Sequence, residues 1–401
     1  MKPSRILLAV PFLALAACGG SNGAQQPFVD AAPSYAALAM DEVAGDSAAP
    51  TSSSMALTDA GAPAMMPGDC HPHLFIRSHE VVARVNHHLY RFLSLVEFVM
   101  ARHPAVAADG QHVWERTLPN GVTVRFTMTR TGEVFSWLLE ASPPGGTFLD
   151  LFSGDIDRTG AAGPRQGKGS LTLDLDNLHT VFPAEPATGV VSAGFELTST
   201  FRHVVVDGAN VAWAIDATMM PAGMDSGALA ALQQPRSGHY VFFHEFGKGG
   251  SLKVKDQMVF LCPSNPSYKL ADGVVVHRWY RFTDGTRHGR SDGVVTGGQL
   301  PDQTPPWARA EGVTCELGST EMGMPDEAYW LWKAEDAGGA TVTGWSGGSG
   351  PSACDPALNP PSGNVPDLVD ATHDFDFGQV TFTTSVDLSA PENQPYPFPG
   401  L

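Results

Sequence analysis

Three histidines near the start of the folded part could bind a transition metal. His71 and His73 form a His-Pro-His pair, and His79 follows six residues later. Neutral imidazole nitrogens suit zinc or copper, but a site needs a third or fourth ligand that the fold would have to supply. The segment beginning at His79 is not an HExxH motif, because Ala83 stands where the second histidine is needed. Two interpretations stay open: a metal site on these histidines, and histidines that cap and pack beside a disulfide.

Acidic residues at positions i and i+2 could offer oxygens to calcium, because alternate residues of a strand point to the same side. Such pairs occur at Asp155 and Asp157, at Asp174 and Asp176, and at Asp374 and Asp376. None reaches the ligand density of an EF-hand loop. We expect solvated strand faces and no cofactor, with zinc and calcium as the alternatives.

Two tryptophans in the C-terminal part could bind sugars. Trp330 and Trp332 are spaced to share one face of a strand. Exposed, they could stack on a glycan; buried, they would fill a small β core.

The N-terminus carries a targeting signal. Lys2 and Arg5 precede a short apolar stretch that ends in Leu15-Ala16-Ala17-Cys18, which is too short to span a bilayer. This run resembles the lipobox of bacterial lipoproteins. The resemblance implies that residues 1–17 are removed and that Cys18 is lipidated and anchors the chain in one leaflet. Because Gly19 follows where an inner-membrane retention signal usually has Asp, it also implies the outer membrane, facing either the periplasm or the exterior.

Four further cysteines are an even number in an exported chain, which predicts two disulfides. Three pairings are possible. We favour Cys315 with Cys354, which flank one Gly-rich region, and Cys70 with Cys262.

Charge and composition limit the function classes. The formal net charge is −18, and the 24 basic residues, which include two in the signal, stand against 42 acidic ones. No basic stripe is present, which argues against nucleic-acid binding. Residues 18–68, from the lipidated cysteine onward, are rich in Ala, Ser, Pro and Gly and contain no Lys or Arg, which predicts a disordered linker.

Hydrophobic periodicity changes once along the chain. Apolar residues spaced by three and four predict one long helix that ends before Pro104: Val82, Val85, Leu89, Phe92, Val96 and Val99. From Val113 onward the period is two, as in Val122 to Met128, Leu171 to Leu175 and Val276 to Phe282. Turn signals at 119–121, 131–132, 207–208 and 247–250 separate the runs.

These patterns predict a mainly β fold: an antiparallel meander forming a curved sheet or half-barrel packed on one long N-terminal helix, over residues 69–300. Residues 301–401 are an acidic, Gly- and Pro-rich β region, with hairpins expected at 328–345 and around 374–386, and form either a second unit or a part of the first sheet. The order of lipobox, helix and meander is similar to that of periplasmic lipoprotein carriers with a half-barrel fold. That likeness implies binding of an apolar or lipid-like molecule, although a fold alone does not establish function.

The leading hypothesis is a non-catalytic outer-membrane lipoprotein with a binding or scaffold role and a lipid-like ligand. One alternative is a surface module that binds a glycan or an envelope protein through Trp330 and Trp332. The other is a metal-dependent enzyme that uses His71, His73 and His79.

Overall fold

The structure is a computed structural model. It describes residues 25–40, 85–86, 89–90, 92–108, 110–183, 188–212, 235–262, 265–281, 286–302, 305–319, 326–358 and 377–397.

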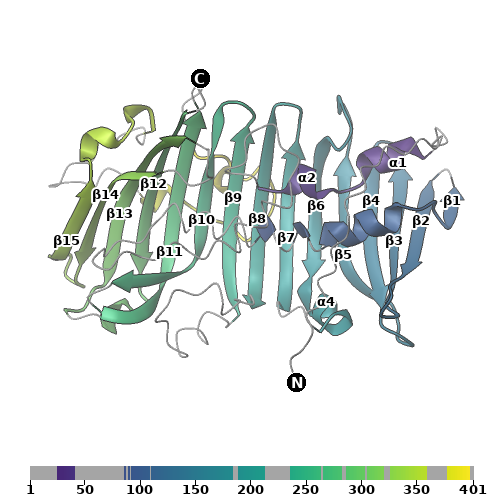
Figure 1. The fold of residues 1–401 in the computed structure, drawn as a ribbon, viewed down its shortest axis with the longest axis horizontal. Helices are drawn as coiled ribbons and strands as arrows, with labels where there is room; N and C mark the ends of the chain where they lie inside the picture. The colour runs from purple at the N-terminus through teal and green to yellow at the C-terminus, as the bar shows by residue number, and fades with distance from the viewer. Residues whose placement is uncertain are drawn as a thin grey trace.

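One antiparallel sheet of fifteen strands organises the described chain, and every strand pairs with its neighbours in sequence. Figure 1 shows the strands side by side, from β1 at one end to β15 at the other. The first strands are β1 Val106–Ala108, β2 Gln111–Thr117, β3 Thr123–Thr131, β4 Val134–Ser142, β5 Leu149–Asp157, β6 Gly167–Asp174, β7 Thr188–Leu197 and β8 Phe201–Ala212. The sheet continues with β9 Arg236–Glu245, β10 Gly249–Cys262, β11 Asn265–Arg281, β12 Thr286–Thr296, β13 Arg309–Ser319, β14 Asp326–Glu335 and β15 Thr341–Gly348. The predicted mainly β, curved antiparallel meander is confirmed.

Alternating side chains form these strands as expected. In β3, the buried Val124, Phe126 and Met128 alternate with partly buried neighbours, so one face of the strand packs and the other meets solvent. Gly121 and Gly132 have positive φ angles of 82° and 64° at two hairpin turns, a conformation that favours glycine. The turn predicted at 207–208 is wrong: β8 runs through Gly208, with a register shift between Gly208 and Val211.

Helices cover one face of the sheet, which we call the helix face. They are α1 Gln26–Ala31, α2 Tyr35–Leu38 and the helical residues 85–86, 89–90 and 92–100, together the helical layer. Figure 1 shows this layer lying across the first half of the sheet. On the predicted long helix, Phe92, Val96 and Val99 are at most 1% exposed, which confirms its apolar face. A further helix, α4 Leu175–Val181, connects β6 with β7 and is capped by the Asp174 carboxylate.

The disorder predicted for residues 18–68 is wrong for residues 25–40. Phe28 and Leu38 are 1% and 2% exposed, and Met40 is fully buried. Met40 also exchanges two hydrogen bonds with the Asn86 side chain, at 2.7 and 2.5 Å. The segment is therefore part of the core, because its apolar side chains find a partner surface on the sheet.

The opposite face of the sheet is covered by residues 377–397, which we call the C-terminal strap; this opposite face is the strap face. The strap contains two 3₁₀ turns, η7 Phe377–Gln379 and η8 Pro391–Asn393. The hairpin predicted around 374–386 is wrong for the described residues 377–386, which contain no strand. Other 3₁₀ turns are η3 Leu300–Asp302, η5 Pro351–Ala353 and η6 Pro356–Leu358.

The region after residue 301 extends the same sheet through β13, β14 and β15. The hairpin expected within 328–345 is confirmed as β14 and β15. The predicted disulfide between Cys315 and Cys354 is also confirmed, with 5.1 Å between the Cα atoms, and it ties the chain after β15 back onto β13. No helix among the described residues is long and apolar enough to cross a membrane.

Candidate functional site: an apolar cavity under the helical layer

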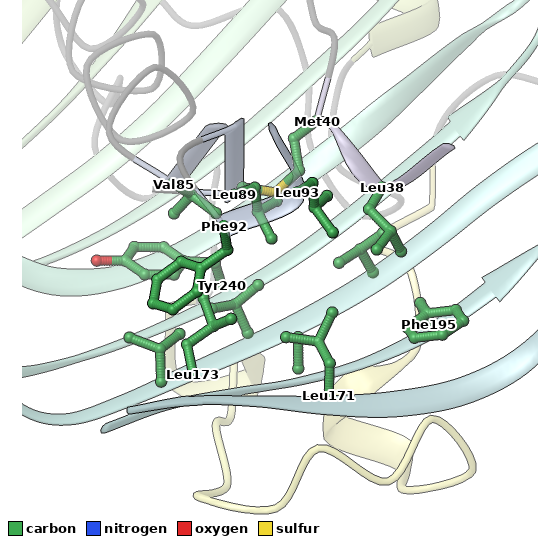
Figure 2. Packing of buried hydrophobic residues seen from close by; sticks show 14 of the residues in the cluster. Leu38, Met40, Val85, Leu89, Phe92, Leu93, Leu171, Leu173, Phe195 and Tyr240 are labelled. Atoms are coloured by element: carbon green, nitrogen blue, oxygen red, sulfur yellow. The ribbon is translucent and has the colours of Figure 1, made fainter. Parts of the chain in front are cut away.

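An apolar cavity lies between the helical layer and β6, β7 and β8. It has a volume of about 20 Å³, and its lining residues are Leu38, Val85, Leu89, Leu171, Leu173, Val191, Ala193, Phe195, Val204 and Val206. Figure 2 shows Leu38, Val85 and Leu89 on the helical side and Leu171, Leu173 and Phe195 on the sheet side. Every lining residue is apolar, so a water molecule inside would find no hydrogen-bond partner among these side chains.

The strand period explains why only apolar groups reach the cavity. Val191, Ala193 and Phe195 alternate along β7 on the helix face. Val190, the neighbour on the other face, is 40% exposed. The two short helical segments add Leu38 and Leu89 from above. The site therefore results from two amphipathic patterns, of period two and about 3.6, facing each other.

Polar contacts hold the helical layer at its edges. Arg116 Nη1 donates to the Phe98 carbonyl at 3.2 Å, and Arg202 Nη1 donates to the Ala39 carbonyl at 3.1 Å. Both join the layer to the sheet without entering the cavity lining. Dispersion and apolar burial dominate the middle of the interface, and these forces have no preferred direction.

The strap face holds a contrasting site, a hydrogen-bond network centred on the fully buried Asn393. Its Nδ2 donates to the carbonyls of Ser385 and Asp387, both at 2.9 Å, and so shapes the strap itself. Its main-chain oxygen lies 2.7 Å from Nε2 of His203 on β8. Its Oδ1 lies 3.0 Å from Nε2 of His239 on β9. One residue, through its main chain and its side chain, thus joins the strap to two neighbouring strands.

The His239 ring has a polar partner on each side in this network. Asn393 Oδ1 can only accept, because Nδ2 makes the two donor bonds. On the other side of the ring, Nδ1 lies 3.2 Å from Oδ1 of Asp207, and an ionised carboxylate also only accepts. The His239 ring thus bridges Asn393 of the strap and Asp207 of β8.

Two more basic side chains, His203 and Lys253, lie beneath the strap. Burial lowers the pKa of His203, and the hydrogen bond to Asn393 opposes this shift only in part. Burial also lowers the pKa of Lys253 to about 8, against an opposing contribution from Glu392. Lys253 Nζ donates to the Glu392 carbonyl at 2.5 Å. The strap therefore covers polar side chains of the sheet and supplies hydrogen-bond partners to them.

Two buried polar groups on β11 to β13 have geometries that fit structural roles. His277 Nδ1 lies 2.7 Å from Ser291 Oγ, and that hydroxyl donates to Glu316 Oε1 at 3.3 Å. The three side chains are at most 2% exposed, so their hydrogen bonds to one another are those expected of buried polar groups. On the strap face, Asp292 accepts from Arg278 at 2.9 Å and from Arg290 at 2.7 Å, as expected for buried charges.

A third polar cluster fixes the chain after the disulfide. Asp355 accepts from Tyr280 and lies 2.6 Å from Nδ1 of His288. Burial acts to raise the pKa of Asp355, but the hydrogen bonds from Tyr280, Ala357 and His288 outweigh it and hold the pKa below its usual range. Burial, together with the bond to Asp355, raises the pKa of Tyr280.

The sugar-stacking pair predicted from the sequence is not available on this surface. Trp332 is fully buried and belongs to the main core, and Trp330 is partly buried and packs against it. The two residues share a strand face, as predicted, but that face is the packed one. The core interpretation therefore holds, because β14 turns this face inward.

The predicted metal ligands His71, His73 and His79 lie outside the described residues, as do Cys18, Cys70, Asp374 and Asp376. Cys262 ends β10, and its pairing with Cys70 stays a prediction. Elsewhere in the described chain, no group of three or more His, Cys, Asp or Glu side chains converges as metal ligands would. Asp155 accepts from Ser170 at 2.6 Å, and Asp174 caps α4, so neither residue is arranged for calcium.

The sequence analysis missed Leu38 and Asn393. Leu38 stands in an Ala- and Pro-rich segment with few charges, and the cluster of Phe28, Leu38 and Met40 was the available signal. Asn393 stands in a Pro-rich tail without periodicity, and no local pattern marks it.

No family model, no curated protein and no solved structure matches this chain.

Proposed function

We propose that this protein is a non-catalytic lipoprotein of the outer membrane that binds an apolar, lipid-like molecule between the sheet and the helical layer. The observation that carries the proposal is the cavity at this interface, whose lining is entirely apolar. Pockets for lipid-like molecules are concave and mostly apolar. The lipobox resemblance at Cys18 supports the anchor and the location.

Binding requires the helical layer to move. A cavity of about 20 Å³ is comparable to the space that one water molecule needs, so an alkyl chain enters only if the layer shifts outward. The apolar contacts permit such a shift, since an alkyl chain can replace the contacts of Leu38, Val85 and Leu89 with equivalent ones. The two arginine contacts at the edges would keep the layer attached during opening.

The test fills the cavity from the sheet side. Val191→Trp places a large ring where the lining is now a valine, and Val190→Trp makes the same change on the exposed side of β7. Binding of dansyl-undecanoic acid would be measured by fluorescence, and co-purifying mass by native mass spectrometry. We expect the control to bind like the wild type and Val191→Trp to lose at least about tenfold in affinity, which corresponds to about 1.4 kcal/mol.

Thermal unfolding of both variants separates a filled site from a misfolded chain. If neither the probe nor a co-purifying lipid binds to the wild type, the proposal is wrong and a scaffold role remains. If Val191→Trp folds and still binds like the control, binding takes place elsewhere.

A further inference from the structure

We propose that β15 is a dimerisation edge, which pairs with β15 of a second copy of this chain in antiparallel orientation and extends the sheet across a two-fold axis. Among the described strands, the open sheet has two edges, β1 and β15. Such edges present unpaired backbone groups that can pair with another strand. This inference is independent of the proposed ligand, because it concerns the end of the sheet far along the strand order from β6, β7 and β8.

The two edges differ in the features that normally prevent pairing. β1 has only three residues, which is too short to template another strand. β15 has eight residues, Thr341–Gly348, with no charged side chain and no proline. Charged side chains, especially lysine, and prolines are features with which proteins usually protect long edge strands, and β15 has neither. In a chain with a formal net charge of −18, an uncharged edge is a place where two copies can meet without repulsion.

The hydrogen-bond register shows which backbone groups point outward. The Ser349 N–H donates to the Ala328 carbonyl at 2.7 Å. Hydrogen-bonded and non-hydrogen-bonded pairs alternate in an antiparallel ladder. Going back along the register of β14 and β15, the N–H and C=O groups of Gly344 and Ser346 therefore point away from β14.

The outward groups are reachable. Gly344 and Ser346 are both exposed, and because Gly344 has no side chain, its exposed surface is backbone. Neither position carries a large side chain of its own, since one is glycine and the other is serine. A partner strand can therefore approach to the usual distance of about 4.8 Å.

A second copy is the partner that this edge fits. With a two-fold axis at residue 345, Gly344 of one copy lies opposite Ser346 of the other, and each such pair exchanges two hydrogen bonds. The arrangement is closed, since the same edge is used on both sides and the short β1 remains at each far end. Pairing β15 with β1 of another copy would instead give an open filament, and β1 offers only three residues for it.

The test measures the mass of the full chain in solution. Cys18→Ser removes the predicted lipid anchor from every sample, so that micelles do not hold copies together. Sedimentation velocity over a concentration series should then show twice the mass of one chain for this background and for Ser346→Ala. Ser346→Pro, which removes one outward N–H, should give the monomer mass, with at least about a tenfold weaker dimer.

A crosslinking experiment keeps the proposal testable if the proline variant does not fold. One sample carries Gly344→Cys and a second, isotopically labelled sample carries Ser346→Cys. After mixing, a short bis-maleimide should join residue 344 of one copy to residue 346 of the other, as identified by mass spectrometry. A monomer at all concentrations, or a dimer that keeps its mass in folded Ser346→Pro and gives no such crosslink, would overturn the proposal.

Discussion

The two faces of the sheet are closed by different kinds of contact. On the helix face, side chains such as Phe92 and Val96 pack with no exposure and few polar contacts. On the strap face, Asn393, His203 and His239 form a directional network. Apolar contacts can be exchanged for others of similar area, whereas a buried hydrogen bond is lost as soon as its geometry changes. The helix face is therefore suited to open for a ligand, and the strap face to keep one arrangement.

A glycine of the sheet allows the strap to pack closely on the strap face. A Cβ at Gly194 of β7 would collide with the carbonyl oxygen of Val386 in the strap. The strap thus approaches the sheet backbone directly, and Leu388 then packs against Val205 and Val241. The close approach at Gly194, the packing of Leu388 and the hydrogen bonds of Asn393 all hold the strap. We therefore expect a change that detaches the strap to break all three together.

The largest effect is expected from Phe92→Ala. Removing a fully buried aromatic ring costs about 3–5 kcal/mol in lost burial and residual cavity. Chemical denaturation followed by tryptophan fluorescence measures the change, and Glu97→Gln, on the exposed side of the same helix, is the control. A loss below about 1 kcal/mol would show that the helix contributes little to the closed state and would contradict tight packing on this face.

A smaller and local effect is expected from Asn393→Ala. The change leaves His239 Nε2 and the carbonyls of Ser385 and Asp387 without their present partner, at about 1–3 kcal/mol for buried groups. Water can reach these groups if the strap detaches, so we expect faster hydrogen exchange over residues 377–397. Exchange in β6 and β7 should remain slow.

Ser389→Ala is the control for this variant, because Ser389 is exposed and its hydroxyl donates to the Asp387 carboxylate within the strap. If Asn393→Ala speeds exchange in the helical layer as much as in the strap, the two faces are coupled and the comparison between them fails.

The sequence predicted what depends on local periodicity. The alternation at Val124, Phe126 and Met128 and the helical spacing of Phe92, Val96 and Val99 were sufficient, since each pattern reflects one strand or helix with one buried face. The Cys315–Cys354 disulfide was the favoured one of three possible pairings, because the two cysteines flank one Gly-rich region. Each of these features depends on residues that lie within about ten to forty positions of one another in the sequence.

What the sequence did not reveal depends on contacts between distant segments. Asn393 meets His203 and His239 across 190 and 154 residues, and no pattern within the tail marks it for burial. Met40 meets Asn86 across 46 residues, within a segment whose composition resembles a linker. Tertiary contacts outweighed local composition in both cases.

The smallest effect is expected from pH and involves His203. Because burial lowers the pKa of His203 below its ordinary value of 6.5, the unfolded state binds the proton more readily than the folded state. Stability is therefore fully present above about pH 6.5 and falls as the pH decreases below that value. Unfolding free energies at pH 7.5 and 5.5 should differ more in the wild type than in His203→Gln, whose amide can donate to the Asn393 carbonyl without titrating.

His203→Asn is the matched variant, because its shorter amide does not reach the position of Nε2. It should lose both the pH dependence and part of the strap's protection from exchange, whereas His203→Gln should lose only the former. An equal response of the wild type and His203→Gln to acid would assign the pH dependence to other groups. The hydrogen bond from His203 would then fix the strap only by its geometry, and proton uptake at this position would have no part in loosening the strap.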